Sequence, residues 1–324
     1  MAFDPTAPFC AYCYKQNGEK LKKCSKCHSR CYCSRACQAQ DWRIGCHKLF
    51  CGQVGENGVD YEIRPSPDKK GLGVFASRDI HRDETILAER SVAETASCMP
   101  KEKSVRAAIM ALTPLEGPTV LDRSSFRSKF QRNNVGGLHL NFARVNHDCI
   151  GNSHHAFDEE RGVILLVAST TIRKGEEITY SYTFQTPHSE AIKKHSLYWD
   201  FTCTCRACRF PEIAHKLDLM LKYDHQIVKE GREAHECIDI ATKKLLPLYN
   251  EFECSSYLYS RIYSDLFQFS ITQRKTYEQA MNYIRLAYQE SLTFFGYEAP
   301  LTKKKHNNVL HPEESPNYMA LEYR

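Results

Sequence analysis

The chain has 324 residues, of which 42% are hydrophobic, and its formal net charge is +5. This length is enough for one large domain or for two to three smaller ones, each with an apolar core. No apolar run approaches the roughly 20 residues of a membrane span, and the first residues lack a signal-peptide pattern. We therefore predict an intracellular protein, in the nucleus, the cytoplasm or both, whose 16 cysteines bind metal rather than form disulfides.

Cysteines are concentrated near the N-terminus, where nine lie between Cys10 and Cys51. Closely spaced ligand pairs of this kind hold zinc in tetrahedral sites, with Zn–S bonds of about 2.3 Å. The segment has little apolar surface to bury, so bound metal would supply its folding energy. The pairs, in chain order, are Cys10 with Cys13, Cys24 with Cys27, Cys33 with Cys37, and His47 with Cys51.

The stretch from Tyr32 to Trp42, followed by His47-Lys48, resembles the MYND zinc finger in its spacing and in its Cys-Gln-x2-Asp-Trp sequence. The resemblance implies two cross-braced zinc sites, formed by Cys10, Cys13, Cys33 and Cys37 and by Cys24, Cys27, His47 and Cys51. Family members have fewer residues between the tryptophan and the histidine, so Cys46 is an alternative ligand to His47. Cys31 is interpreted as a small buried residue. Such fingers bind peptides, often ones that contain proline.

The first 51 residues are basic, with nine Lys or Arg against three acidic residues. A basic segment can bind nucleic acid. However, seven zinc-bound thiolates outweigh the charge of two zinc ions and lower the net charge of the finger by three. We therefore expect no direct binding to nucleic acid.

After a glycine-rich linker at residues 52–58, short strands are expected, with a helical region between them. Gly71 and Gly73 flank Leu72, and without Cβ atoms this backbone could approach a ligand closely, although a plain hairpin turn is the alternative. Cys98 is interpreted as a buried thiol. Apolar or alternating patterns predict strands at residues 61–64, 71–76, 85–88, 162–168 and 178–182, and a helical region at 100–135.

Polar residues cluster around Asn146, His147 and Cys149, and burying them would be costly unless each has a partner. Four sequence pieces occur here in a fixed order, and together they resemble a SET domain with its trailing post-SET cysteines. With the finger in front, the chain resembles the SET and MYND domain lysine methyltransferases. The pieces are Lys70 to Phe75, Val145 to Asn152, Gly175 to Tyr182, and Cys203 to Cys208.

The resemblance implies a site for S-adenosylmethionine and a channel for a lysine side chain. Tyr182 would be the catalytic tyrosine and a cofactor neighbour, and Tyr198 and Trp199 would line the lysine channel. Asn134 is a looser candidate for a cofactor contact. The cofactor would lie against Lys70, Gly71, Leu72, Gly73, Asn146, His147 and Phe201.

The resemblance also gives Cys149 a function. Cys203, Cys205 and Cys208 supply three thiolates, one short of a structural zinc tetrahedron. In the family the fourth ligand comes from the cysteine of the Asn-His-x-Cys motif, which is Cys149 here. We therefore expect three zinc ions in total.

Two residues depart from the family pattern. Asp148 stands where serine is usual, and Gly151 stands where proline is usual. Glycine is expected to make this turn more flexible than proline would. These departures keep open the alternative of a weak or inactive adaptor that recruits protein partners through the finger.

The C-terminal third has helical periodicity. One stripe contains Leu258, Ile262 and Leu266, and a second, resembling a tetratricopeptide-type helix, runs from Tyr277 to Tyr288. Residues 301–324 are polar and are predicted to be a disordered tail.

The prediction is therefore a monomeric α+β protein that acts on a histone or non-histone lysine. It comprises a finger (1–52), a SET β-fold with its post-SET zinc segment (58–210), and a C-terminal α-helical, tetratricopeptide-like domain (211–300).

Overall fold

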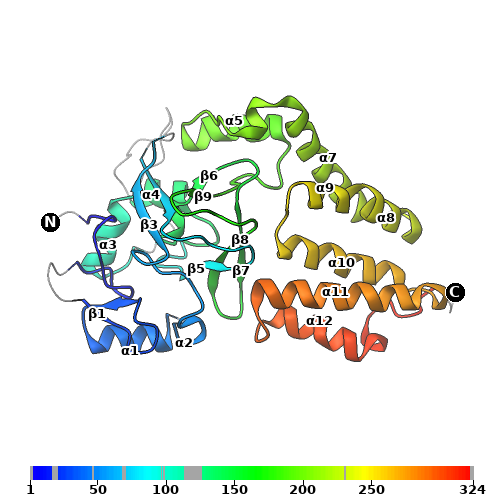
Figure 1. Ribbon diagram of the computed structural model, residues 1–324, viewed down its shortest axis with the longest axis horizontal. Helices are drawn as coiled ribbons and strands as arrows, with labels where there is room; N and C mark the ends of the chain where they lie inside the picture. The colour runs from blue at the N-terminus through cyan, green and yellow to red at the C-terminus, as the bar shows by residue number, and fades with distance from the viewer. Residues whose placement is uncertain are drawn as a thin grey trace. The chain divides into compact units, whose positions relative to one another are not determined.

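The computed structural model describes residues 3–16, 21–45, 47–67, 71–95, 97, 99–112, 126–229 and 231–321. The chain divides into two compact units (Figure 1). One contains Met1–Tyr182 and Ser189–Cys203, and the other contains Thr183–His188 and Thr204–Arg324. The finger and the SET region, which the sequence separates at residues 52–58, thus belong to one unit. The helical unit begins at Thr204, before the predicted residue 211.

The finger consists of short elements around cysteine side chains. Strands β1 (Lys22–Lys23) and β2 (Cys31–Tyr32) pair antiparallel and are followed by helices α1 (Arg35–Arg43) and α2 (His47–Phe50). The Ser34 hydroxyl accepts a hydrogen bond of 3.1 Å from the Cys37 backbone N–H, which caps the start of α1. The buried core of the finger is Cys10, Cys24, Tyr32 and Cys51. Apolar burial is therefore small, as predicted.

Two small sheets form the SET region. The first has the order β3-β4-β9-β6, with β3 (Tyr61–Pro65), β4 (Leu72–Ala76), β9 (Glu177–Tyr180) and β6 (Asn146–His147). The second has the order β5-β8-β7, with β5 (Thr85–Arg90), β8 (Val163–Ala168) and β7 (Ser153–Asp158). Every residue of β8 is buried, as its apolar run predicts.

Strands β6 and β9 pair in parallel, with Asn146 opposite Thr179 and His147 opposite Tyr180. This register brings two segments that are thirty residues apart in the sequence onto neighbouring strands. The predicted strand at 178–182 ends at Tyr180, so Tyr182 lies just past the strand. Four further elements belong to this part of the chain: α3 (Lys103–Met110), α4 (Phe126–Asn133), η1 (Phe142–Arg144) and α5 (His188–Trp199).

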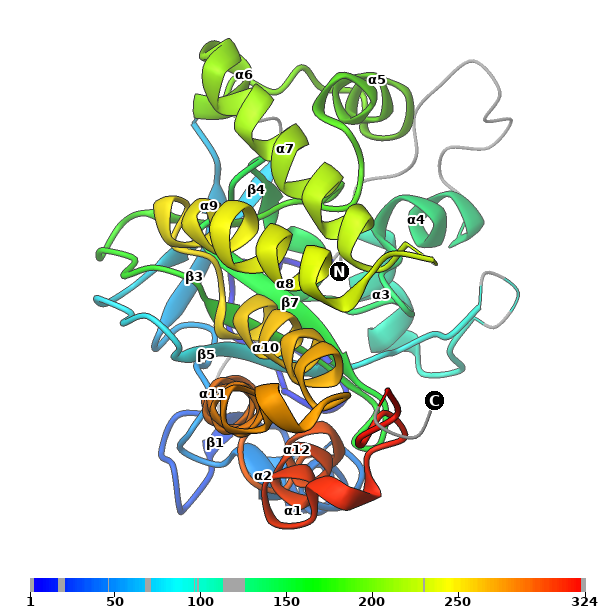
Figure 2. The same cartoon turned by 90° about the vertical axis from the view of Figure 1, so that its right-hand side faces the viewer.

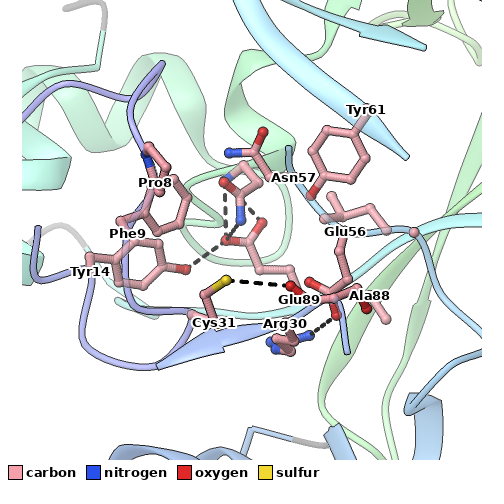
Figure 3. A pocket seen from close by; sticks show the side chains of 15 residues that line it. Pro8, Phe9, Tyr14, Arg30, Cys31, Glu56, Asn57, Tyr61, Ala88 and Glu89 are labelled. Atoms are coloured by element: carbon pink, nitrogen blue, oxygen red, sulfur yellow. Dashed lines mark hydrogen bonds and ion pairs between the residues drawn. The ribbon is translucent and has the colours of Figure 1, made fainter. Parts of the chain in front are cut away.

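A buried carboxylate joins the finger to the SET region (Figure 3). Glu89, on β5, accepts a 2.9 Å hydrogen bond from the Tyr14 hydroxyl of the finger and 3.0 Å hydrogen bonds from the backbone N–H groups of Asn141 and Phe142. The predicted linker is also anchored, because the Gly55 N–H donates to the Thr85 carbonyl at 3.1 Å. These contacts explain why finger and SET region form one unit.

The second unit is made of helices. Helix α10 packs against α11, and α11 packs against α12 (Figure 2). Leu258, Ile262 and Leu266 of the first predicted stripe are buried on α10, and Ala280, Ile284 and Ala287 of the second are buried on α11. The helices are α6 (Arg206–Arg209), α7 (Pro211–Ile227), α8 (Ala234–Ile240), the π-helical turn η2 (Ala241–Leu245), α9 (Leu246–Glu251), α10 (Ser256–Ser270), η3 (Arg274–Thr276), α11 (Tyr277–Phe295), α12 (Pro300–Leu310) and η4 (Pro312–Glu314).

The prediction of a disordered tail from residue 301 is wrong for most of that segment, because it contains α12 and η4. Thr302 is fully buried and exchanges hydrogen bonds with Ser291 of α11. The ring of His306 stacks on Tyr288, with centroids 4.8 Å apart. Polar and aromatic contacts therefore hold this helix, which is why its sequence shows no apolar stripe. Within the described part of the chain, none of the helices combines the length and apolar character needed to cross a membrane.

Candidate metal and cofactor sites

Among the residues that the structure describes, three groups of four side chains bring their ligand atoms within 4.8 Å of one another. The groups are Cys10, Cys13, Cys33 and Cys37; Cys24, Cys27, His47 and Cys51; and Cys149, Cys203, Cys205 and Cys208. All twelve residues are the predicted zinc ligands, in the predicted combinations. Cys46 and Cys98 lie outside the described residues. Cys31 is half-buried and donates to the Ser29 carbonyl, so it takes no part in these groups.

The spacing of the ligand atoms fits a zinc ion. Four sulfurs at about 2.3 Å from one ion lie about 3.8 Å from each other, at the corners of a tetrahedron. The sulfur pairs Cys13–Cys33, Cys33–Cys37, Cys24–Cys51 and Cys149–Cys203 are separated by 3.6, 3.5, 3.9 and 4.0 Å. A disulfide would bring such sulfurs to about 2.05 Å. The residues present therefore fit zinc in each group.

The Asn146 side chain is held by two strands of its sheet. Its Nδ2 atom donates to the Leu72 carbonyl at 3.1 Å and to Glu177 Oε1 at 2.6 Å. Gly73 borders this pair, and a Cβ there would overlap Glu177 Oε1 and lie 2.9 Å from Asn146 Nδ2. The second glycine of Gly-x-Gly thus makes room for a polar pair inside the protein. The predicted cofactor neighbour Lys70 lies outside the described residues.

His147 and Tyr182 contact each other directly. The Tyr182 N–H donates to His147 Nδ1 at 3.1 Å, and the Tyr182 hydroxyl donates to the Val145 carbonyl at 2.9 Å. Burial raises the pKa of the Tyr182 hydroxyl, so this phenol stays protonated at neutral pH. The predicted catalytic tyrosine therefore lies against the predicted cofactor-binding strand.

Aromatic rings surround this pair. The ring centroid of Tyr182 is 5.2 Å from Trp199, and that of His147 is 5.7 Å from Phe201. The sequence did not indicate a role for His195, which is fully buried. Its ring centroid lies 4.0 Å from that of His147, and its ring stacks on Phe201 with centroids 5.1 Å apart. A lone histidine on a helix gives no sequence signal for such a position. By contrast, Tyr198 is 50% exposed.

The two departures from the family pattern have structural functions. Asp148 Oδ1 accepts from the backbone N–H groups of Ile150 at 2.9 Å and Gly151 at 3.3 Å, and so orders the turn after His147. Gly151 has φ +64°, and a Cβ there would lie 2.9 Å from the Tyr180 Cα. Proline cannot adopt this backbone conformation. Gly151 therefore lies in a tight turn packed on β9, at a position where proline would not fit.

Asn134, the looser cofactor candidate, has a local contact. Its Oδ1 accepts from the Gly137 N–H at 2.7 Å, and this bond closes the turn between α4 and η1. Nearby, Arg132 donates to the Trp199 carbonyl at 2.6 Å, and the Trp199 indole N–H donates to the Arg132 carbonyl at 3.2 Å. These bonds fix Trp199 beside Tyr182.

The chain thus combines a cysteine-rich finger with two small sheets, and in one sheet the strand with Asn146 and His147 pairs with the strand before Tyr182. These features together define a protein with a zinc finger and a SET fold. Family comparison agrees: the SET domain family matches residues 71–183, and the MYND finger family matches residues 10–51. The chain therefore contains a MYND finger followed by a SET domain, the two domains on which its resemblance to the SET and MYND domain lysine methyltransferases rests.

Several curated proteins are similar to parts of this chain. Histone-lysine N-methyltransferase SMYD1 of Homo sapiens is 25% identical over 247 residues, covering 64% of this chain and 49% of that protein. Histone-lysine N-methyltransferase set5 of Schizosaccharomyces pombe is 28% identical over 167 residues, covering 47% of this chain and 51% of that protein. SET domain-containing protein 14 of Caenorhabditis elegans is 41% identical over 54 residues, covering 17% of this chain and 12% of that protein. The chain matches about half the length of the first two relatives.

Proposed function

We propose that this protein is an S-adenosylmethionine-dependent protein-lysine N-methyltransferase. The parallel pairing of β6 and β9 carries the proposal, because it joins Asn146 and His147 to the strand that ends just before Tyr182. The similarity to two histone-lysine N-methyltransferases supports the same activity. The substrate would be a histone or non-histone lysine.

The residues around β6 suit the cofactor. S-adenosylmethionine supplies an activated methyl group, so the protein has to orient the reactants and exclude water. Gly71, Leu72 and Gly73 would border its methionine end, with open space beside Gly71 at φ +96°. Asn146 and His147 would contact it, and Phe201 would stack on its adenine. For Asn134 the support is weaker, because its side-chain oxygen already accepts from Gly137.

The aromatic surroundings suit a lysine side chain. A lysine in water has a pKa of about 10.4, and only the neutral amine can attack a methyl group. Burial among the rings of Tyr182 and Trp199 would lower that pKa by desolvation, with a cation–π attraction opposing part of the shift. The Tyr182 hydroxyl would orient the amine. His147 needs no role as a general base, since its Nδ1 already accepts the Tyr182 N–H.

Calorimetry with S-adenosylmethionine tests the proposal first. We expect the folded, zinc-loaded protein to bind it, and radiolabelled methyl transfer to histones or to proteins of a cell extract should follow. Folded protein that does not bind the cofactor would instead favour the adaptor alternative, in which the finger recruits partners.

Tyr182→Phe separates chemistry from binding. Because it removes only the hydroxyl, it should lower the rate of methyl transfer by a factor of about 100 or more, while the Kd for the cofactor stays within about twofold of the wild type. Single-turnover transfer and calorimetry measure the two quantities. Wild-type turnover by this variant would exclude Tyr182 from the mechanism.

The MYND finger is a protein-interaction module, and we infer that it binds proline-containing peptides. Exposed apolar side chains on the finger, Ile44 at 51% and Leu49 at 43%, support a peptide surface. Chemical-shift perturbation in the zinc-loaded full chain by a proline-rich peptide, compared with the same peptide carrying alanine for proline, tests this. A monomeric state and a nuclear or cytoplasmic location remain predictions, to be checked by light scattering and by imaging of the tagged protein.

A further inference from the structure

Glu177, the first residue of β9, contacts three other strands of its sheet or their ends. Its Oε1 accepts from Asn146 Nδ2 on β6, and its Oε2 accepts from the Ser66 hydroxyl after β3 at 3.3 Å. Gly73 of β4 leaves the space that the carboxylate fills. The neighbouring Glu176 is exposed. Glu177, the second glutamate of the Gly-Glu-Glu turn, therefore makes specific contacts within the sheet. The sequence alone does not distinguish it from Glu176.

This contact determines which way the Asn146 amide faces. An asparagine amide has two N–H donors and one carbonyl acceptor. The Nδ2 group donates to Leu72 and to Glu177, both of which can only accept at these atoms. Among the residues that the structure describes, Asn146 Oδ1 has no hydrogen-bond partner. The free acceptor is thus directed away from the two protein acceptors.

We propose that Glu177 is a positioning residue, which fixes the Asn146 amide so that Oδ1 receives the α-ammonium group of the cofactor. The inference rests on the proposed function and adds to it a residue and a contact. An ammonium group carries only donors, so an asparagine turned the other way would present N–H groups to it. A carboxylate enforces one orientation because it cannot donate a hydrogen bond. A glutamine at position 177 could donate as well as accept, so only the Leu72 carbonyl would still favour this orientation of the amide.

The test compares two ligands that differ only at the amino-acid end. S-adenosylhomocysteine carries the α-ammonium group, and 5′-methylthioadenosine lacks the amino-acid end, while both are thioethers. Ligand-observed NMR and calorimetry give the Kd of each for the zinc-loaded full chain. The variants are Glu177→Gln and, as the matched control, Glu176→Gln.

We expect Glu177→Gln to raise the Kd for S-adenosylhomocysteine by roughly 10-fold to 100-fold, which is the range expected for the loss of a hydrogen bond to a charged group. Its Kd for 5′-methylthioadenosine should stay within about twofold, and Glu176→Gln should change neither Kd. In Gly73→Ala, the added Cβ on β4 would displace Glu177 and Asn146 from each other. This variant should also bind S-adenosylhomocysteine more weakly while its Kd for 5′-methylthioadenosine stays unchanged. In turnover, Glu177→Gln should raise KM for the cofactor with little change in kcat.

Two outcomes would overturn the inference. An equal loss for both ligands would mean that Glu177 supports the fold in general, and an unchanged Kd for S-adenosylhomocysteine would mean that it does not orient Asn146. In either case the wild type still binds, and the proposed function stands. If the wild type binds neither ligand, the proposed function fails and the inference fails with it.

Discussion

The finger and the helical unit have cores of different chemistry. In the finger, the buried hydrophobic cluster consists of three cysteines, Cys10, Cys24 and Cys51, and one large ring, Tyr32. In the helical unit, Ile262, Leu266 and Phe267 are fully buried within a large apolar cluster. Bound metal can supply most of the folding free energy of a small cysteine-rich module, whereas apolar burial supplies it for packed helices. Removal of metal should therefore destabilise the finger and leave the helical unit folded, whereas a cavity in the helical core should destabilise the helical unit and leave the finger folded.

Removing zinc should have the largest effect. A strong chelator withdraws metal-binding free energy of about 10 kcal/mol from a structural site, so backbone amides of the finger should lose protection from hydrogen exchange. Amides of α10 and α11 should keep theirs. Exchange measured on the full chain by mass spectrometry reports both regions in one sample.

Cys24→Ser sharpens the same comparison. It should lower bound zinc from three ions to two and deprotect the finger, while Cys237→Ser, a buried thiol of α8 outside the three ligand groups, should leave the zinc content at three. Retained protection of the finger after complete metal loss would contradict the assignment of its folding energy to zinc.

A cavity in the helical core should have the reverse pattern. Ile262 is fully buried on α10, and Ile262→Ala should cost the helical unit about 2–5 kcal/mol in the free energy of unfolding. Leu292→Ala on α11 is the matched control, because Leu292 is 38% exposed. Denaturant titration followed by exchange of α10 amides measures the difference, and the zinc content should stay at three. A cost no larger than that of Leu292→Ala would contradict the proposed core.

The SET region depends on backbone geometry as well. Gly151→Ala should destabilise the turn on β9 by about 1–3 kcal/mol, because alanine disfavours the positive φ and its Cβ would be too close to Tyr180. Asp148→Ser should cost less, about 1 kcal/mol, since serine can still accept one of the two backbone hydrogen bonds. Unfolding of the zinc-loaded variants measures both. An unchanged stability of Gly151→Ala would show that the turn can relax.

The smallest expected effect is electrostatic. Burial raises the pKa of Asp265, on α10, to about 6 from its ordinary 3.8. A carboxyl whose folded pKa is raised stabilises the fold below its unfolded pKa, and this contribution is lost as the pH rises towards 6. In the wild type, the free energy of unfolding of the helical unit should fall by about 1 kcal/mol as the pH rises through this range, and in Asp265→Asn this fall should be absent. Exchange protection of α10, corrected for intrinsic rates, measures it; an identical pH dependence in the variant would contradict the burial of this charge.

Sequence spacing was sufficient for the zinc ligands, because Cys-x2-Cys pairs carry their geometry locally. The family resemblance, carried by the order of four motifs, also predicted that the Asn146–His147 segment and Tyr182 belong to one site, and His147 does contact Tyr182. It could not distinguish Glu177 from Glu176, since their difference depends on which strand edge each side chain meets. The sequence also does not show that Gly151 has a positive φ, which is the structural reason for glycine at this position. Helix α12 was missed because its contacts, such as Thr302 with Ser291, are polar.

The hydrogen bond from the Tyr182 N–H to His147 Nδ1 has a consequence for proton position. A ring nitrogen that accepts a backbone N–H cannot carry a proton of its own, so neutral His147 has its proton on Nε2. Nε2 lies 3.3 Å from the Cys149 sulfur, which gives that proton a thiolate acceptor. One imidazole tautomer would thus link Cys149, a candidate zinc ligand, to the backbone of Tyr182, the proposed catalytic tyrosine, and the ¹⁵N chemical shifts of the ring would record it.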